Sequence, residues 1–314
     1  MFAACLAIVA CSNPQEVFTE FQEGPYTVTS IEKNVYHIQD CNDANPSGET
    51  FDETGKPTHF NNCSDIYLLA GSEKALLIDL SNDVKWADNA AESLRSIVYG
   101  LIGDKPLEIT FTHNHGDHTG MLPAFIAEQN AYFMLPSVDF SRLANRFPEG
   151  KYEFYDEGYE FNLGDMNVST VMVPGHTNGS MVFSLVGKDL LMTGDAIGSG
   201  HGVWIFNEAG FENYKQGIEH LMDFINDKAN AIDTKALRVF GGHYWQKDWF
   251  PELKDTELGM QYILDMQQLV SNVVDGTAEH EPSGLSQQNL DTYYRNGLAI
   301  IAGNHSFIES SQEN

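Results

Sequence analysis

Basic residues are scarce in this chain: 17 Lys and Arg stand against 45 Asp and Glu in 314 residues, for a formal net charge of -28. Affinity for nucleic acid rests largely on Lys and Arg that neutralise phosphates, and anionic lipid attracts the same residue types. The composition therefore argues against a nucleic-acid partner and against docking on an anionic membrane surface. A chain with 42% hydrophobic and 20% charged residues is otherwise an ordinary globular protein, so we interpret the acidic excess as a source of solubility.

Long apolar runs are also missing, and no segment has the uninterrupted apolar length of a membrane helix. Residues 1–10 are apolar but too short to span a bilayer, and Cys11 and a polar stretch follow them. This order resembles a bacterial lipoprotein signal with a lipidated Cys11, although the usual basic region is absent. We therefore expect residues 1–24 to form a signal and short tether. The protein would then be exported, periplasmic or membrane-anchored, and would contact the membrane only through a lipid on Cys11. An uncleaved N-terminus or a truncated start is the alternative.

Cysteine is limited to four residues, two of which, Cys5 and Cys11, fall in the signal. The other two, Cys41 and Cys63, flank a loop rich in Asn, Gly and Pro, and they lack the close spacing of a zinc-binding pair. In an exported protein, such a pair favours a disulfide. We expect a Cys41–Cys63 disulfide across this loop, with two free thiols as the alternative.

Apolar runs of strand length alternate with amphipathic segments of helical length. Strands are expected at 26–38, 66–69, 75–79, 107–111, 131–134, 168–173, 181–186, 189–192, 237–240 and 298–302, and helices at 87–98, 121–129, 214–226 and 256–274. Such alternation predicts a layered α/β protein. We expect one domain over residues 25–314, with a C-terminal helical extension from about residue 255.

The most informative segment is residues 112–120, where His113, His115, Asp117 and His118 follow an apolar, β-branched run. Loops at strand ends commonly carry function, and neutral imidazole and carboxylate are typical zinc ligands. The segment predicts a metal site at the edge of a sheet, with a solvated histidine-rich loop as the alternative.

Three later strand ends carry the same kinds of residue. His176 follows Pro-Gly, Asp195 follows Thr-Gly and His243 follows Gly-Gly. A small residue lets the backbone bend so that the next side chain turns inward. Four such strand ends in one chain indicate a shared metal centre.

In this order and context, the seven residues resemble the metallo-β-lactamase superfamily, and within it the branch with two metals. The pattern is His-x-His-x-Asp-His, then Gly-His-Thr, a bridging Asp and a final Gly-His, and the resemblance runs from about Tyr26 to Tyr244. It implies an α/β fold, a four-layer αβ/βα sandwich with the metals at one edge. It assigns His113, His115 and His176 to a first zinc, and Asp117, His118 and His243 to a second, with Asp195 bridging both.

The same resemblance implies two Zn²⁺, with iron or manganese as alternatives, and a small-molecule substrate. Two divalent ions about 3.5–4 Å apart can hold a hydroxide that attacks an ester-type bond and can stabilise the charge that develops. Asp117 would take part in this catalytic set as well as in metal binding. The expected function is therefore a metal-dependent hydrolase.

The sequence departs from the patterns of several branches of this superfamily, and these departures limit the classes of substrate that we expect. True zinc β-lactamases generally lack a bridging aspartate such as Asp195, and quorum-signal lactonases place a tyrosine where this chain has Gly198. Glyoxalase II binds glutathione through basic residues, but the tail after Lys254 has only Arg295. Carboxylic or sulfate esters are favoured, and phosphodiesters, lactones and β-lactams are alternatives. A mononuclear iron persulfide dioxygenase and a binding module without turnover are rivals of other classes.

Further candidates lie near the ligands in the sequence. His201 could donate a hydrogen bond to a substrate oxygen, and Tyr244 could polarise it. Trp204 and Phe206 are either an apolar wall of the site or part of the core. The resemblance also implies that Asp79, at a strand end, orients the metal loop.

Overall fold

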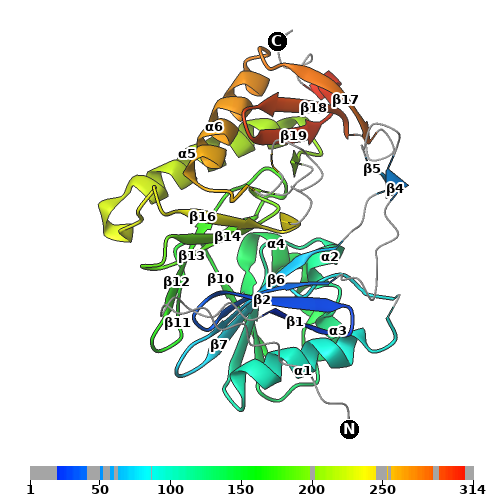
Figure 1. The fold of residues 1–314 in the computed structure, drawn as a ribbon, viewed down its shortest axis with the longest axis vertical. Helices are drawn as coiled ribbons and strands as arrows, with labels where there is room; N and C mark the ends of the chain where they lie inside the picture. The colour runs from blue at the N-terminus through cyan, green and yellow to red at the C-terminus, as the bar shows by residue number, and fades with distance from the viewer. Residues whose placement is uncertain are drawn as a thin grey trace, which may run out of the picture.

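Two β-sheets lie face to face and form the centre of the molecule (Figure 1). The computed structural model describes residues 20–40, 50–51, 57–59, 63–85, 87–198, 202–244, 253, 256–285 and 290–307. The strand order of the larger sheet is β1-β2-β3-β6-β7-β8-β9-β10 and that of the smaller sheet is β11-β12-β13-β14-β16. The larger sheet contains β1 (Glu20–Glu23), β2 (Tyr26–Glu32), β3 (Val35–Gln39), β6 (Asp65–Ala70), β7 (Ala75–Ile78), β8 (Leu107–Thr110), β9 (Ala131–Pro136) and β10 (Tyr152–Tyr155). The smaller contains β11 (Glu160–Asn162), β12 (Asn167–Met172), β13 (Met181–Leu185), β14 (Leu190–Gly194) and β16 (Arg238–Gly241).

Helices cover the outer faces of both sheets, as the predicted αβ/βα sandwich requires. α1 (Ala90–Ile102) and α3 (Leu122–Phe125) pack on the larger sheet, and α5 (Glu208–Asn226) and α6 (Met260–Val274) pack on the smaller. The remaining short elements are α2 (Gly116–Thr119), α4 (Ser137–Phe140), the 3₁₀ turns at Ser141–Arg146 and Lys228–Asn230, and the pair β4 (Thr50–Phe51) and β5 (Pro57–His59). The predicted four-layer α/β fold is confirmed.

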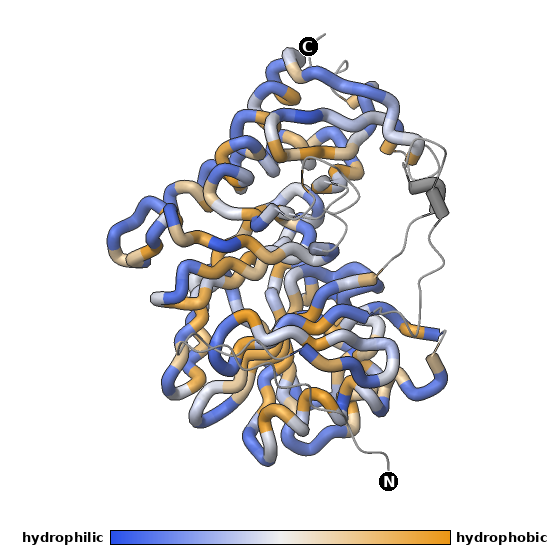
Figure 2. Tube along the Cα trace, in the orientation of Figure 1, coloured by the Kyte–Doolittle hydropathy of each residue, from blue (hydrophilic) through white to orange (hydrophobic). Residues whose placement is uncertain are grey.

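Strand β6 shows why the inner strands read as continuous apolar runs. Ile66 and Leu68 pack toward α1, whereas Tyr67 and Leu69 pack toward the smaller sheet, and all four are fully buried. A strand covered on both faces needs apolar side chains at every position. Figure 2 shows the hydrophobic segments running through the middle of the molecule and the hydrophilic ones along its outer helices and loops.

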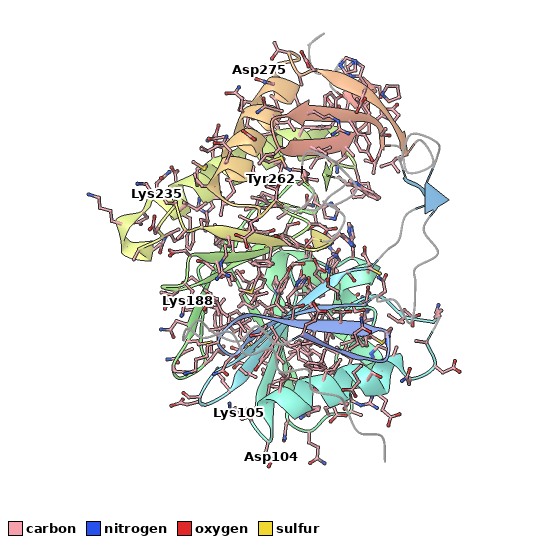
Figure 3. All side chains as sticks on the ribbon, viewed as in Figure 1. Asp104, Lys105, Lys188, Lys235, Tyr262 and Asp275 are labelled. Atoms are coloured by element: carbon pink, nitrogen blue, oxygen red, sulfur yellow. The ribbon has the colours of Figure 1, made fainter. Side chains whose placement is uncertain are left out.

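The surface and the core separate in the same way at the level of side chains. Charged side chains such as Asp104, Lys105 and Lys235 project from the periphery (Figure 3). Tyr262 of α6 is only 1% exposed and packs among the apolar residues beneath it.

A third sheet joins the C-terminal segment to the rest. It has the order β15-β19-β18-β17, made of β15 (Val203–Trp204), β17 (His280–Leu285), β18 (Leu290–Asn296) and β19 (Ala299–Gly303). The expectation of a helical extension from about residue 255 was incomplete, since α6 is followed by β17, β18 and β19. The short run of β17 contains Pro282 and Gly284, which weaken the strand pattern in the sequence.

Other boundaries also differ from the expectations. The run 26–38 is a hairpin of two strands, because Asn34 at its turn has a φ of 61°. Strand β1 pairs with β2, so the folded region already includes Glu20, which precedes the expected start at residue 25. Helix α5 begins six residues before the expected start, because the side chain of Asn207 caps it by accepting from the Gly210 N–H at 3.0 Å. The expected helix at 121–129 reduces to α3, and α6 begins at Met260 instead of residue 256.

Some predictions fall outside the described residues. The proposed signal, with Cys5 and Cys11, belongs to this part, as does Cys41. Cys63 is disulfide-bonded, and its predicted pairing with Cys41 stays a prediction. Within the part of the chain that the structure describes, no helix combines the length and apolarity needed to cross a bilayer.

Strand direction brings the ligand-bearing loops to one edge. β8 runs parallel to β7, and β14 runs parallel to β16. β12 is antiparallel to β13, which is antiparallel to β14, so β12 and β14 point the same way. Within each sheet, the loops after β7 and β8 or after β12, β14 and β16 open at one edge, and the side chains that they carry from the two sheets meet there.

Candidate metal centre

The histidine-rich segment leaves β8 as an extended loop and then turns back through α2. His115 is the N-cap of α2 and has a φ of -69° and a ψ of 157°, so His113 and His115 stand before the helix. Asp117 and His118 lie inside its single turn, and the Leu80 N–H donates to the carbonyl of His118 at 2.8 Å. The turn thereby divides the motif into two pairs that face different neighbours.

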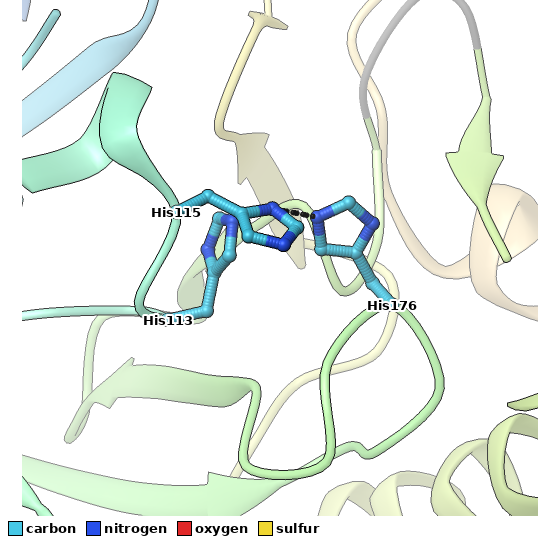
Figure 4. A group of neighbouring side chains, drawn as sticks. All are labelled: His113, His115 and His176. Atoms are coloured by element: carbon cyan, nitrogen blue, oxygen red, sulfur yellow. Dashed lines mark hydrogen bonds between the residues drawn. The ribbon is translucent and has the colours of Figure 1, made fainter. Parts of the chain in front are cut away.

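The first group consists of His113, His115 and His176, whose rings converge from two loops (Figure 4). The ring centroids of His113 and His176 are 4.8 Å apart, and those of His115 and His176 are 4.7 Å apart. Nε2 of His176 lies 2.9 Å from Nδ1 of His115. His113 and His176 are buried, and His115 is half-buried.

The second group consists of Asp117, His118, Asp195 and His243. Nε2 of His243 lies 3.4 Å from Oδ2 of Asp117. The rings of His118 and His243 are 5.3 Å apart, and both histidines are buried.

Asp195 faces both groups. Its Oδ2 lies 3.4 Å from Nε2 of His176 and 3.9 Å from Nε2 of His113, in the first group. Its Oδ1 lies 3.4 Å from Nε2 of His118, and its Oδ2 lies 3.5 Å from Nε2 of His243, in the second group. Asp195 therefore lies between the two groups, and its role as a bridging carboxylate stays a prediction.

Two observations show that these residues fit metal ions. Ligand atoms about 2.0–2.1 Å from a tetrahedral ion stand about 3.3 Å from one another, close to the separations of 3.4 Å and 3.5 Å around Asp195. In addition, Nε2 of His113, Nε2 of His118 and Oδ1 of Asp195 are buried and have no hydrogen-bond partner among the described residues. Buried polar atoms normally have partners, and a cation between them would supply one.

Asp79 fixes the orientation of the second group, as predicted. Its Oδ2 accepts from Nδ1 of His118 at 2.8 Å, which leaves Nε2 of that ring free to bind a metal. Its Oδ1 accepts from the Thr112 N–H at 2.7 Å, and the Thr112 hydroxyl donates to Oδ2 at 2.7 Å. Because that hydroxyl proton is used, Oγ1 of Thr112 accepts from Nδ1 of His113 at 3.0 Å. One carboxylate therefore sets the tautomers of two ligands.

Two further ligand rings, those of His176 and His243, are held by backbone carbonyls. Nδ1 of His176 donates to the carbonyl of Trp204 at 2.8 Å, and Nδ1 of His243 donates to the carbonyl of Cys63. In both rings Nε2 is the nitrogen that faces Asp195. The rings are thus oriented before any ion is bound.

Burial keeps the first group neutral. It lowers the pKa of His176 to about 4, the pKa of His113 well below its ordinary value, and the pKa of His115 in the same direction. Neutral imidazole is the form that binds a metal, so this group is ready to do so at neutral pH.

The second group is charged. Burial opposes charge on all four members, but opposite charges on the neighbours outweigh it. The carboxylate of Asp195 leads in raising the pKa of His118 and of His243 well above the ordinary value. The two imidazolium ions in turn hold the pKa values of Asp117 and Asp195 below the ordinary range. A cation bound here would replace the protons on the two histidines.

The structure says less about four candidates that were not predicted as metal ligands, namely His201, Tyr244, Trp204 and Phe206. His201 lies outside the described residues. The ring of Tyr244 stacks on Phe240 at 4.9 Å and meets His37 edge-on at 6.0 Å, and its role as an electrophilic donor stays a prediction. Trp204 is half-buried, and Phe206 is exposed beside the first group.

Sequence reasoning missed the residues that fasten the loop of His243. The Tyr244 N–H donates to Oδ2 of Asp65 at 2.6 Å, and Oδ1 of Asp65 lies 3.0 Å from Nε2 of His37. The Tyr67 hydroxyl donates to the carbonyl of Gly241 at 2.5 Å. The signal that was available was the acidic start of an otherwise apolar strand, at Asp65.

Asp139 fastens the first group in a similar way. Its backbone carbonyl accepts from the Asn114 side chain at 3.0 Å, and its carboxylate accepts from the Thr177 hydroxyl at 2.8 Å. Asn114 lies between His113 and His115, and Thr177 follows His176, so Asp139 joins the two loops. No pattern in the sequence marked this residue.

Comparisons with known proteins identify the family and the fold. The family model described as "Metallo-beta-lactamase superfamily" matches residues 64–243, the span that holds all seven candidate ligands. Solved structures of metallo-beta-lactamases from Erythrobacter litoralis and Pontibacter korlensis each give a TM-score of 0.54. They cover 81% and 79% of this chain and 99% of their own chains, at 14% and 18% identity, so they show the fold alone.

Curated relatives are fungal. The chain is 25% identical over 181 residues to an atrochrysone carboxyl ACP thioesterase of Claviceps purpurea, covering 57% of this chain and 50% of that protein. It is 30% identical over 140 residues to the same kind of thioesterase in Aspergillus novofumigatus, covering 44% and 39%. A lactamase-like protein of Penicillium aethiopicum is 31% identical over 146 residues, covering 46% and 43%. The chain thus spans about half the length, or less, of these relatives.

Proposed function

The chain belongs to the metallo-beta-lactamase superfamily, and from this premise we propose that it is a metal-dependent hydrolase of carboxylic esters and thioesters. Hydrolysis adds water across the acyl carbon–oxygen or carbon–sulfur bond and yields a carboxylic acid and an alcohol or thiol. The thioesterase names of the fungal relatives support this class of bond, although the matched segments cover only part of those proteins.

The observation that carries the proposal is the shared carboxylate. Asp195 lies within 3.9 Å of ligand nitrogens in both groups. We assign His113, His115 and His176 to one ion, and Asp117, His118 and His243 to the other, with Asp195 between them. Two bound divalent ions would lower the pKa of bound water toward neutrality and stabilise the negative charge that develops on the ester oxygen.

The protein's own contribution is the order of this site. Asp79, directly or through Thr112, and the two backbone carbonyls keep four of the five imidazoles in the tautomer that presents Nε2 to the centre, namely those of His113, His118, His176 and His243. The burial of His113 and His118 keeps bulk water away from the ligand nitrogens. Asp117 is half-buried, and it would meet the substrate from the open side of the second group.

A panel of substrates tests the proposal. Metal-free protein, protein loaded with zinc and an Asp195→Ala variant are assayed with chromogenic carboxylic esters, thioesters, sulfate esters, phosphodiesters, a lactone and a β-lactam. We expect turnover of esters or thioesters that needs added metal and falls by at least about a hundredfold in Asp195→Ala. A variant of the exposed His220 on α5, His220→Gln, is the matched control and should keep full activity. Zinc-loaded protein that hydrolyses neither the carboxylic esters nor the thioesters contradicts the proposal.

A further inference from the structure

An exposed aromatic side chain stands directly beside the first ligand group. The ring centroid of Phe206 is 5.4 Å from that of His176 and 5.9 Å from that of His115. The ring of Trp204 meets Phe206 edge-on at 6.3 Å and extends the aromatic surface. Phe206 is 36% exposed, so one part of its ring touches the ligands and another part faces solvent.

The backbone holds Phe206 in this place from both sides. Before it, Trp204 pairs with Ala302 in the third sheet, and the Ile205 N–H donates to the carbonyl of Ala302 at 2.9 Å. After it, Asn207 caps helix α5. The carbonyl of Trp204 also accepts from the ligand His176 at 2.8 Å. The third sheet, the helix cap and a candidate metal ligand thus fix residues 204–207. The side chain of Phe206 is therefore held in place before any ligand binds.

Position distinguishes Phe206 from the other exposed apolar residues. A single hydrophobic side chain on a surface needs no explanation. Large exposed hydrophobic residues are also found at Val138, Phe154, Tyr159, Val186 and Leu264. Within the described residues, Phe206 is the one among them whose ring contacts a candidate ligand.

The charges around the centre restrict the ligand further. In the described part of the chain, the ion-pair partners of Asp117 and Asp195 are all histidines, without Lys or Arg. The whole chain carries a formal charge of -28, which repels anions at long range. At long range, this acidic excess favours the approach of a neutral ligand over an anionic one.

We propose that Phe206 is a specificity-determining residue that stacks on an aromatic ring in the acyl part of a neutral ester or thioester. This inference rests on the proposed hydrolase function and adds the class of acyl group. Aromatic pairs gain about 0.5–1.5 kcal/mol beyond the area that they bury. Because each 1.4 kcal/mol is a factor of ten, the preference for an aromatic acyl group is expected to be about twofold to twelvefold.

The kinetic test compares phenylacetyl and acetyl thioesters of one small neutral thiol, using zinc-loaded protein. Each rate is divided by the rate of hydrolysis in hydroxide, so that intrinsic reactivity cancels. The ratio of kcat/KM for phenylacetyl over acetyl should fall about twofold to twelvefold in Phe206→Ala, and by less in Phe206→Leu, which keeps apolar bulk. Phe154→Ala removes a phenylalanine that is 37% exposed on β10 and should leave the ratio unchanged. An unchanged ratio in Phe206→Ala overturns the inference.

A binding measurement separates the inference from the proposed function. Calorimetry gives the affinity of the zinc-loaded protein for benzylacetone, a neutral aryl ketone that cannot be hydrolysed. Tighter binding to wild type than to Phe206→Ala, without turnover of any ester, supports the aryl site and contradicts the hydrolase. Turnover of esters together with equal ketone affinity in the two proteins supports the hydrolase and overturns the aryl site.

Discussion

Gly242 precedes the ligand His243, and its missing side chain leaves the space in which the second group assembles. A Cβ added at this position would lie 2.8 Å from Cε1 of His118 and would overlap Oδ1 of Asp195. Ordinary contacts between such atoms begin near 3.4 Å, so the Gly242→Ala variant must push the two ligands apart. The ligands of the first group are not among the three nearest atoms to this Cβ.

The magnitude follows from the cost of overpacking. Extra bulk in a packed interior costs about 1–3 kcal/mol. Because each 1.4 kcal/mol is a factor of ten in affinity, a cost that falls on metal binding weakens the second ion roughly 5- to 150-fold. We expect Gly242→Ala to keep the ion at His113, His115 and His176 and to lose the other.

Metal content measures this loss. Wild type and variant are dialysed against a series of zinc buffers, and the zinc bound per chain is determined by mass spectrometry, with thermal unfolding followed in parallel. Gly116→Ala is the matched control, because Gly116 lies in the same motif, has open space around its Cβ position and has no left-handed backbone. If Gly242→Ala binds two ions as tightly as wild type, the placement of His118 and Asp195 around one ion is wrong.

Three further predictions concern the supports of the site and the core. Asp79→Asn should weaken zinc binding about 10- to 100-fold, because an amide cannot stabilise the ring of His118 as the carboxylate does. Equilibrium dialysis measures the affinity for zinc. An unchanged affinity would show that Asp79 does not orient this ligand. Loading of the second group should release about one proton each from His118 and His243, since their pKa values are raised well above ordinary. Binding of the second ion should therefore weaken as the pH falls, and calorimetry in buffers of different ionisation enthalpy detects the protons; a second binding step without proton release contradicts it. Phe183 is fully buried in the core between the sheets, so Phe183→Ala should lower the free energy of unfolding by about 3–5 kcal/mol. Urea denaturation measures this loss, with Phe154→Ala as the exposed control. Equal losses of stability in the two variants would refute the assigned core.

The sequence predicts the ligands well because each one is a local signal. His176, Asp195 and His243 each follow a strand and a small residue, and the structure brings all three to the loops of the 113–118 motif. Their convergence depends on β12, β14 and β16 pointing the same way and on the smaller sheet packing against the larger one, which local signals do not show.

Interactions between distant segments could not be read in the same way. Asp65 supports Tyr244 across 179 residues of sequence, and nothing near either residue marks the contact. Phe206 could not be assigned to the wall or to the core, because its exposure depends on the pairing of β15 with β19. β17 was missed because its proline and glycine hide a strand that tertiary pairing with β18 stabilises.

The central claim is that one site, shared at Asp195, holds two metal ions and that both are needed for ester hydrolysis. Titration of metal-free wild type with zinc, with bound metal and ester turnover measured in the same samples, tests it most directly. We predict two ions per chain, with turnover that reaches its maximum only as the second equivalent binds. Full turnover with a single ion per chain, or without any metal, would contradict the account.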